Sequence, residues 1–314
     1  MTENTPKPVL VAVGHDPMDA ALKYAVGEAA RAGCGLHLVH VVHRVTQGPE
    51  TVLVDNADFE RAGRAALDGA LERAGGLVPE EVTVTSELVW GGVVTSIVDI
   101  GATARLIVLE RRPLSRMMRV VTRSVSSGVA AHSRVPVVSV PARWSPVRSS
   151  GAVPTITVGV DVPERSEHIL RAAAQAARSR GTRLRVLHTW AFPGAYDDLM
   201  MSRVEGDEWA ARAKAEIQMV LDEIDDLIGV PVTIEARHAF PSDALVEASR
   251  TSDLLVVGRH DPLVPMGSHL GPVARAVLRE ATCPVLLADP KARDTGHGAG
   301  TVKTRHREDV AHSS

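Results

Sequence analysis

Two short apolar runs, PVLVAV at residues 8–13 and TITVGV at residues 155–160, each open the same order of predicted elements. Polar or glycine residues bound both runs, which is typical of strands buried on both faces of a parallel sheet. Each run is followed by a stripe of small apolar residues with helical spacing, then by a glycine, Gly33 or Gly181, and a second apolar run. The glycines stand where a helix C-cap is expected. The order strand, helix, strand indicates an α/β fold.

The sequence also matches itself weakly at an offset of 148 residues, which pairs His40 with His188 and Pro136 with Pro284. Both halves continue with a helix, a third strand, a short helix, a fourth apolar strand, and a helix before a fifth strand. We therefore predict two tandem, doubly wound, Rossmann-like domains, each with a parallel sheet of five strands. Right-handed crossovers place a ligand crevice at the carboxyl ends of the first and fourth strands.

The domain boundaries follow from shifts in composition. We expect a flexible N-terminus at residues 1–7, a first domain at 8–141, a linker at 142–153, a second domain at 154–289, and a disordered tail at 290–314. The segment between the halves is rich in Pro, Ser and Gly, as linkers are. The tail has almost no apolar residues and no periodicity, so it cannot bury a core.

Composition restricts the class of protein. The 314 residues are 45% hydrophobic and 23% charged, with a formal charge of -3, so the total charge does not favour nucleic acid as a partner. Aromatic residues are only 3%, so the core must be built from Ala, Val and Leu. Two distant cysteines form neither a disulfide framework nor a metal-ligand set. No signal peptide or membrane span is predicted, and we expect a cytoplasmic protein.

Three motifs of the second half carry a resemblance to a known family: VGVD at residues 158–161, DLLVVG at 253–258 and ATCPVLL at 281–287. With them the chain resembles the universal stress protein family, in its tandem two-domain form, which has an adenine nucleotide alpha hydrolase-like fold. The resemblance implies a non-enzymatic protein that acts in the stress response by binding. In the family, fifth strands commonly pair across a two-fold axis. The two halves are therefore expected to pair as an intramolecular pseudo-dimer; a homodimer and an unidentified protein partner stay open.

Family members that bind ATP carry a loop of the form GxxG, nine residues, then G followed by S or T. This frame falls on Gly258, Asp261 and Gly271, and Asp161 matches the family's acidic residue after the first strand. The resemblance thus implies a degenerate site in the second half for ATP or another adenine nucleotide, with Mg²⁺ if it is bound. Asp261 replaces a glycine with a carboxylate. Pro272 replaces the hydroxyl residue and lacks an N–H group for a phosphate.

The first half departs further from this loop. The same frame places Glu110, Pro113, Arg123 and Ser124 at the four positions, and Gly14 stands where the second half has Asp161. The sequence therefore predicts no nucleotide site of the usual kind in the first half.

Several alternatives remain at this point. Residues 105–123 contain six Arg and one Glu, an excess of +5 that could serve an interaction protein on an anionic partner; a solvated or salt-bridged helix face is the simpler interpretation. A slow nucleotide hydrolase is a further alternative, with Asp161 and Asp261 as its only candidate bases. Asp161 could instead cap the helix that follows it. Gly258 and Gly271 could be turn glycines without a ligand. No metal site is expected.

Overall fold

The computed structural model describes residues 6–43, 56–112, 125–146, 153–191, 206–259 and 270–288. Strands and helices alternate through the first half, as the sequence predicted. They are β1 (Val9–Val13), α1 (Asp19–Ala32), β2 (Leu36–Val42), α2 (Asn56–Gly75), β3 (Val84–Trp90), α3 (Val93–Gly101), β4 (Leu106–Arg111), α4 (Val125–His132) and β5 (Val137–Pro141).

The second half repeats this order. It consists of β6 (Thr155–Val160), α5 (Glu167–Arg180), β7 (Arg183–Trp190), α7 (Gly206–Asp222), β8 (Val232–His238), α8 (Pro241–Ala248), β9 (Leu254–Val257), α9 (Pro272–Glu280) and β10 (Val285–Leu287). Short 3-10 turns stand at Pro163–Arg165, before α5, and at Asp225–Leu227, before β8.

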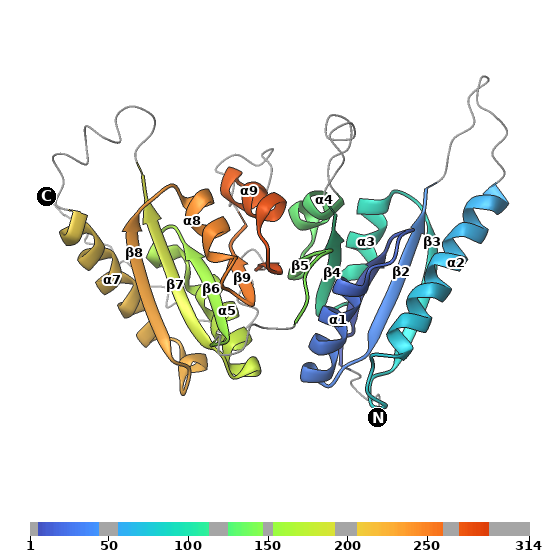
Figure 1. Ribbon diagram of the computed structural model, residues 1–314, viewed down its shortest axis with the longest axis horizontal. Coiled ribbons are helices and arrows are strands. Elements are labelled where there is room, and N and C mark those ends of the chain that lie inside the picture. Colours follow the sequence, from blue (N-terminus) through green and yellow to red (C-terminus); the bar gives the residue numbers. More distant parts are fainter. Residues whose placement is uncertain are drawn as a thin grey trace, which may run out of the picture.

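All ten strands lie in one sheet, in the order β3-β2-β1-β4-β5-β10-β9-β6-β7-β8. Within each half every neighbouring pair is parallel, and the halves join where β5 and β10 pair antiparallel, with Leu286 opposite Val138. Figure 1 shows the two halves side by side on either side of this junction. The expected intramolecular pseudo-dimer is therefore present, and it is built through the fifth strands.

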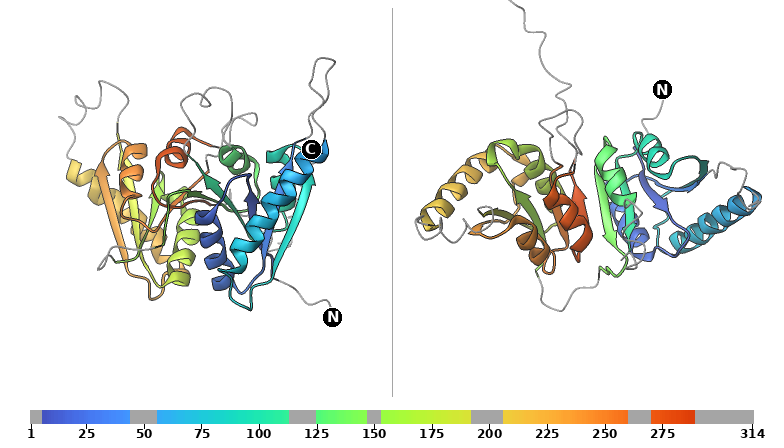
Figure 2. Two further views of the ribbon diagram at one scale, coloured as in Figure 1. Left: turned by 45° about the vertical axis from the view of Figure 1, so that its right-hand side comes forward. Right: turned by 90° about the horizontal axis from the view of Figure 1, so that it is seen from above.

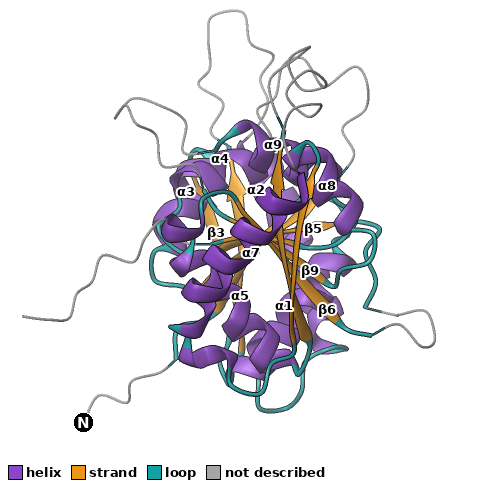
Figure 3. Ribbon diagram, turned by 90° about the vertical axis from the view of Figure 1, so that its left-hand side faces the viewer, coloured by secondary structure: helices purple, strands orange, loops and turns teal. Residues whose placement is uncertain are grey.

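Helices cover both faces of the sheet, as Figures 2 and 3 show. Buried residues of α1, α2, α5 and α7 form one core with one face of the strands, and buried residues of α3, α8 and α9 form another with the opposite face. Both cores are dominated by Ala, Val, Leu and Ile, in agreement with the low aromatic content. Each core extends across both halves, which binds the two repeats into one folded unit.

Local features recur at equivalent positions of the two halves. Gly33 and Gly181 end α1 and α5 with φ values of 58° and 60°, a left-handed conformation that favours glycine. His40 and His188 each direct Nδ1 at the carbonyl that ends the first strand of their half, Val13 O at 2.9 Å and Val160 O at 3.0 Å. The predicted glycine C-caps are confirmed.

Two equivalent arginines connect the halves. Arg111, at the end of β4, donates hydrogen bonds to the carbonyls of Leu278 and Ala281 at the C-terminus of α9. Arg259, two residues after β9, donates to the carbonyls of Ser133 and, at 2.7 Å, Val135, just after α4. Each guanidinium therefore satisfies carbonyls at the end of a helix in the other half, where a positive charge is favoured. The arrangement is reciprocal, as a two-fold contact requires.

The predicted linker and tail lie mostly outside the described residues, so the domain boundaries stay a prediction. Among the helices that the structure describes, none combines the length and apolarity that a membrane crossing requires.

Candidate functional site

The crevice predicted from the strand order lies where β6 and β9 end side by side. These strands are parallel neighbours, and Val158 faces Val256 in their ladder. Asp161 and Gly258 follow these two positions closely, so both stand at the carboxyl edge of the sheet, at the point where the strand order reverses. The structure therefore brings together two of the four candidate residues predicted from sequence.

Asp161 is exposed at this edge. It does not cap the following helix, because a 3-10 turn intervenes and Ser166 is the N-cap residue of α5. The Ser166 hydroxyl donates instead to the carbonyl of Val162 at 2.7 Å. The helix-capping alternative for Asp161 is thus wrong, and its carboxylate is presented to the solvent side of the crevice.

Gly258 packs tightly against the start of α5. A Cβ atom at this position would lie 2.4 Å from Cδ1 of Ile169, far inside van der Waals contact. An alanine here would therefore require the end of the Ile169 side chain to move, whether or not a ligand is bound. This contact supports the interpretation of Gly258 as a structural glycine. It does not alter where the backbone of Gly258 lies at the crevice.

Gly271 is the N-cap residue of α9, and Pro272 is its first helical residue. Proline suits this position because its missing N–H would have no partner within the helix. The N–H groups of Val273 and Ala274 are still among the unpaired donors of the first turn and carry the positive end of the helix dipole. These N–H groups are of the kind that binds an anion such as a phosphate. Asp261, the fourth candidate residue, lies outside the described residues.

The equivalent crevice of the first half contains an internal carboxylate. Glu110 occupies the position of Gly258, and its Oε2 accepts a hydrogen bond of 3.3 Å from the backbone N–H of Ala21, in the first turn of α1. Burial raises the pKa of Glu110, while the Ala21 N–H and the Arg112 guanidinium act in the opposite direction. The side chain is only 6% exposed. An anion bound near this position would therefore meet an acidic group of the protein itself.

Arg112 makes further contacts around the Glu110 carboxylate. Its guanidinium forms ion pairs with Asp16 at 2.8 Å and with Glu110 at 3.2 Å, and it also donates to the carbonyl of Pro17. These contacts tie the loop after β1 to the end of β4. That the first half holds no nucleotide site of the usual kind stays a prediction.

The difference between the two crevices involves a second pair of equivalent residues, which the sequence analysis did not identify. Ala21 and Ile169 are equivalent at the offset of 148 residues, as are Glu110 and Gly258. The small residue of α1 leaves room for the glutamate, and the large residue of α5 fills the space above the glycine. Comparing the first helical turns at the repeat offset would have revealed this reciprocal change in size.

Some arginines of the Arg-rich segment, residues 105–123, form contacts within the protein. Arg111 bonds to carbonyls of the other half and Arg112 to acidic side chains of its own half. Arg116, Arg119 and Arg123 lie outside the described residues. The cationic surface available to a partner is therefore smaller than the sequence count suggests.

A metal ion would find few ligands in the described crevice. Within the described ranges, no group of three or more His, Cys, Asp or Glu side chains is placed to hold one. Asp161 supplies one carboxylate, which does not by itself make a metal site.

Comparisons with known proteins agree with the repeat. A model of the universal stress protein family matches residues 5–141 and again residues 153–289. A universal stress protein of Mycobacterium tuberculosis is 29% identical over 286 residues, covering 86% of this chain and 92% of that protein.

Solved structures show the same fold. A universal stress protein from Archaeoglobus fulgidus covers 92% of this chain and 98% of its own, with a TM-score of 0.65 at 15% identity. A universal stress protein solved in complex with cAMP covers 44% of this chain and 98% of its own, at 26% identity and a TM-score of 0.35. The chain belongs to the universal stress protein family and contains two of its domains in tandem.

Proposed function

We propose that this tandem universal stress protein acts by binding, without catalysis, and that it has one degenerate adenine-nucleotide site, in its second half. The site would comprise Asp161, Gly258, Asp261 and Gly271, with Mg²⁺ accompanying the nucleotide. One observation carries the proposal: the crevice position that holds the Glu110 carboxylate in the first half holds Gly258 in the second. Only the second crevice lacks this built-in negative charge.

Each residue has a chemical role in this proposal. The first-turn N–H groups of α9 would bind a phosphate at the positive end of the helix. Asp161, exposed at the carboxyl edge, would accept hydrogen bonds from a hydroxyl or amino group of the nucleoside. Two unit charges about 4 Å apart at an effective dielectric of about 20 repel by roughly 4 kcal/mol, so Asp261 beside a phosphate would require a cation. Mg²⁺ would supply that charge.

Calorimetric titration of the full chain with ATP, with and without Mg²⁺, tests the proposal. We expect one binding event per chain that depends on Asp161, with an affinity that rises with Mg²⁺ and falls at least tenfold in Asp161→Asn. The matched control is Glu110→Gln, which changes the equivalent crevice and should leave the titration unaltered.

Three outcomes would contradict parts of the proposal. Absence of heat with ATP and AMP, with or without Mg²⁺, removes the nucleotide clause. ATP binding that changes in Glu110→Gln but not in Asp161→Asn would place the nucleotide site in the first half instead of the second. Sustained phosphate release above a no-protein blank would show a slow hydrolase instead of a binding protein.

A further inference from the structure

A groove runs between the two halves, away from the candidate nucleotide site. Its walls come from α1, the segment after β5, the C-terminal end of α5, and the turns that precede β9 and β10. These turns lie at the amino ends of their strands, opposite the edge that bears Asp161 and Gly258. The volume is about 790 Å³, which is within the usual range for small-molecule sites, and such sites occur preferentially between domains.

Among the residues that the structure describes, the charged lining of the groove is mostly cationic: Lys23, Arg31, Arg143, Arg180 and Arg250 against Asp253. Glu28 pairs with Arg31 and Arg180 and offsets part of this charge. The Asp253 carboxylate accepts a 2.7 Å hydrogen bond from the backbone N–H of Thr155, which partly offsets its charge. A concave surface lined by one sign of charge concentrates ligands of the opposite sign.

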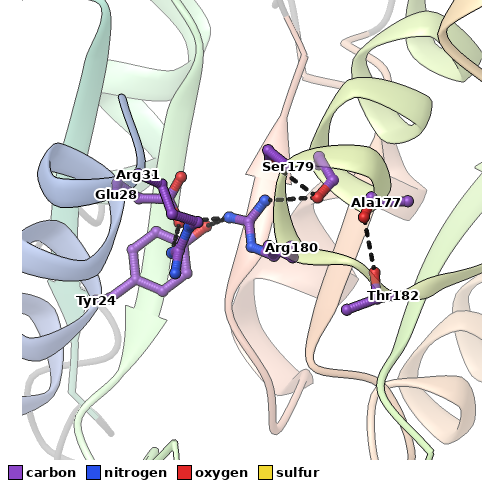
Figure 4. Close-up of polar contacts among 8 residues, drawn as sticks. Tyr24, Glu28, Arg31, Ala177, Ser179, Arg180 and Thr182 are labelled. Carbon is purple, nitrogen blue, oxygen red and sulfur yellow. Dashed lines mark hydrogen bonds and ion pairs between the residues drawn. The ribbon is translucent and has the colours of Figure 1, made fainter. Parts of the chain in front are cut away.

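One side of the groove is rigid. Figure 4 shows Arg180 of α5 reaching toward Tyr24 and Glu28 of α1. Arg180 donates to the Tyr24 hydroxyl at 3.0 Å and pairs with Glu28, which also pairs with Arg31. The Arg180 side chain is only 13% exposed. Arg180 also donates to the carbonyl of Ala176 at 3.1 Å, so it contributes to the groove mainly as a positive charge fixed in place.

Tyr24 adds a hydroxyl donor to this rigid side. Its ring is buried and packs edge-on against Trp144, with ring centroids 5.7 Å apart. Burial, and to a lesser degree Glu28, raise the pKa of Tyr24, so the hydroxyl keeps its proton. While its oxygen accepts from Arg180, the O–H can still donate to a ligand.

The other side of the groove holds uncommitted charge. Lys23 of α1 and Arg143, which follows β5, are both exposed, and neither has an ion-pair partner within the part of the chain that the structure describes. Cations of this kind can turn toward an incoming anion without breaking an existing contact. The groove thus combines fixed and adjustable cations around one hollow.

We propose that this groove binds a small anion bearing two or more phosphates, independently of the nucleotide site proposed above. Several guanidinium groups favour phosphate because their planar fork donates two parallel hydrogen bonds to its oxygens. The volume exceeds what a single phosphate would fill. A nucleic-acid strand fits less well, because Tyr24 and Trp144 are the aromatic residues among the described lining and Tyr24 is buried, which leaves few rings for bases to stack on. Inorganic triphosphate and the triphosphate of a nucleotide share the required chemistry.

Calorimetric titration of the full chain with inorganic triphosphate tests this proposal. We expect binding that weakens as salt increases and that falls at least tenfold, about 1.4 kcal/mol, in the double variant Lys23→Gln, Arg143→Gln. The matched control is Arg212→Gln, Lys214→Gln, which removes the same charge from exposed positions of α7. Thermal unfolding of each variant checks that the fold is intact.

A second titration, with ATP, separates the two sites. If both exist, ATP binds twice per chain; Asp161→Asn removes one event and the Lys23, Arg143 variant removes the other. If the wild type shows no ATP event that Asp161→Asn removes, the nucleotide site is refuted and the groove proposal stands. The groove proposal is overturned if triphosphate does not bind, if the α7 control weakens binding equally, or if citrate binds as tightly as triphosphate.

Discussion

The two halves fill the same crevice position in opposite ways. In the first half, Glu110 accepts a hydrogen bond from the backbone N–H of Ala21, a small residue. In the second half, Gly258 leaves no side chain, and the larger Ile169 packs directly above it. One crevice holds an internal carboxylate paired with Arg112, whereas the other holds the Ile169 side chain packed over a glycine.

Other features differ little between the halves, and they are the ones that hold the fold together. The glycine C-caps, the histidines near the strand ends and the arginines that connect the halves all recur at equivalent positions. The repeats have therefore kept the contacts that pair them and diverged where a ligand would bind. A duplicated binding fold can lose one site without loss of its framework, because the framework contacts lie elsewhere.

The largest effect is expected from removing the shared arginines together, as Arg111→Ala, Arg259→Ala. Each donates two hydrogen bonds to carbonyls of the other half, and a hydrogen bond to a charged group contributes roughly 1.5 to 3 kcal/mol. We expect a loss of at least about 3 kcal/mol, measured by urea unfolding. The control Arg134→Ala removes an exposed arginine beside Ser133. An equal shift in the control would show that the reciprocal contact is unimportant.

A smaller effect, about 1 to 3 kcal/mol, is expected for Gly258→Ala, because the new methyl overlaps Cδ1 of Ile169. Ile169→Val removes that atom and should cost about 0.5 to 1.5 kcal/mol alone. Combined with Gly258→Ala, it should restore much of the lost stability, and unfolding curves of the four proteins give the coupling energy. If Gly258→Ala is as stable as the wild type, packing does not explain this glycine, and a ligand becomes the better explanation.

A pH-dependent effect should distinguish Glu110 from the glycine that replaces it. Burial raises the pKa of Glu110 above its ordinary value of 4.5, so the folded state binds this proton more tightly than the unfolded state does. The stability contributed by the group is full at lower pH and is lost as pH rises through the folded pKa. Glu110→Gln has no carboxyl group at this position, so its stability does not show this loss as the pH rises.

The stability of the wild type relative to Glu110→Gln should therefore fall as pH increases from below 4.5 to neutrality. Urea unfolding at several pH values measures it. Glu223→Gln, at an exposed position of the second half, is the control and should show no such trend. A difference that stays constant with pH would contradict the buried position of Glu110.

The smallest effect is expected for Gly14→Asp, which gives the first half the acidic residue of the second. A Cβ atom at Gly14 meets no atom within 4 Å, so the free energy of unfolding should change by less than about 0.5 kcal/mol. The variant should not gain an ATP site, since Glu110 still occupies the crevice. An ATP event that is absent from the wild type would show that the acidic residue after the first strand determines binding and that the Glu110 contact does not block it.

Much of the fold could be predicted because its signals are local. The apolar runs of β1 and β6, the helical stripes of α1 and α5, and glycines at positions that need positive φ each depend on a few neighbouring residues. Of the predicted site, Asp161 and Gly258 lie at the expected edge, Gly271 opens α9, and Asp261 lies outside the described residues. The packing reason for Gly258 could not be predicted, since Ile169 lies far from it in the sequence.

The sequence by itself determined that the chain is a repeat of one α/β unit, because hydrophobic periodicity and glycine caps are written into adjacent residues. Only the tertiary structure decided what the unequal residues do. Glu110 meets the Ala21 N–H across 89 residues, and Arg111 meets the Ala281 carbonyl across 170. Contacts over such separations depend on how the strands are ordered in the sheet and how the halves pair, which no local pattern specifies.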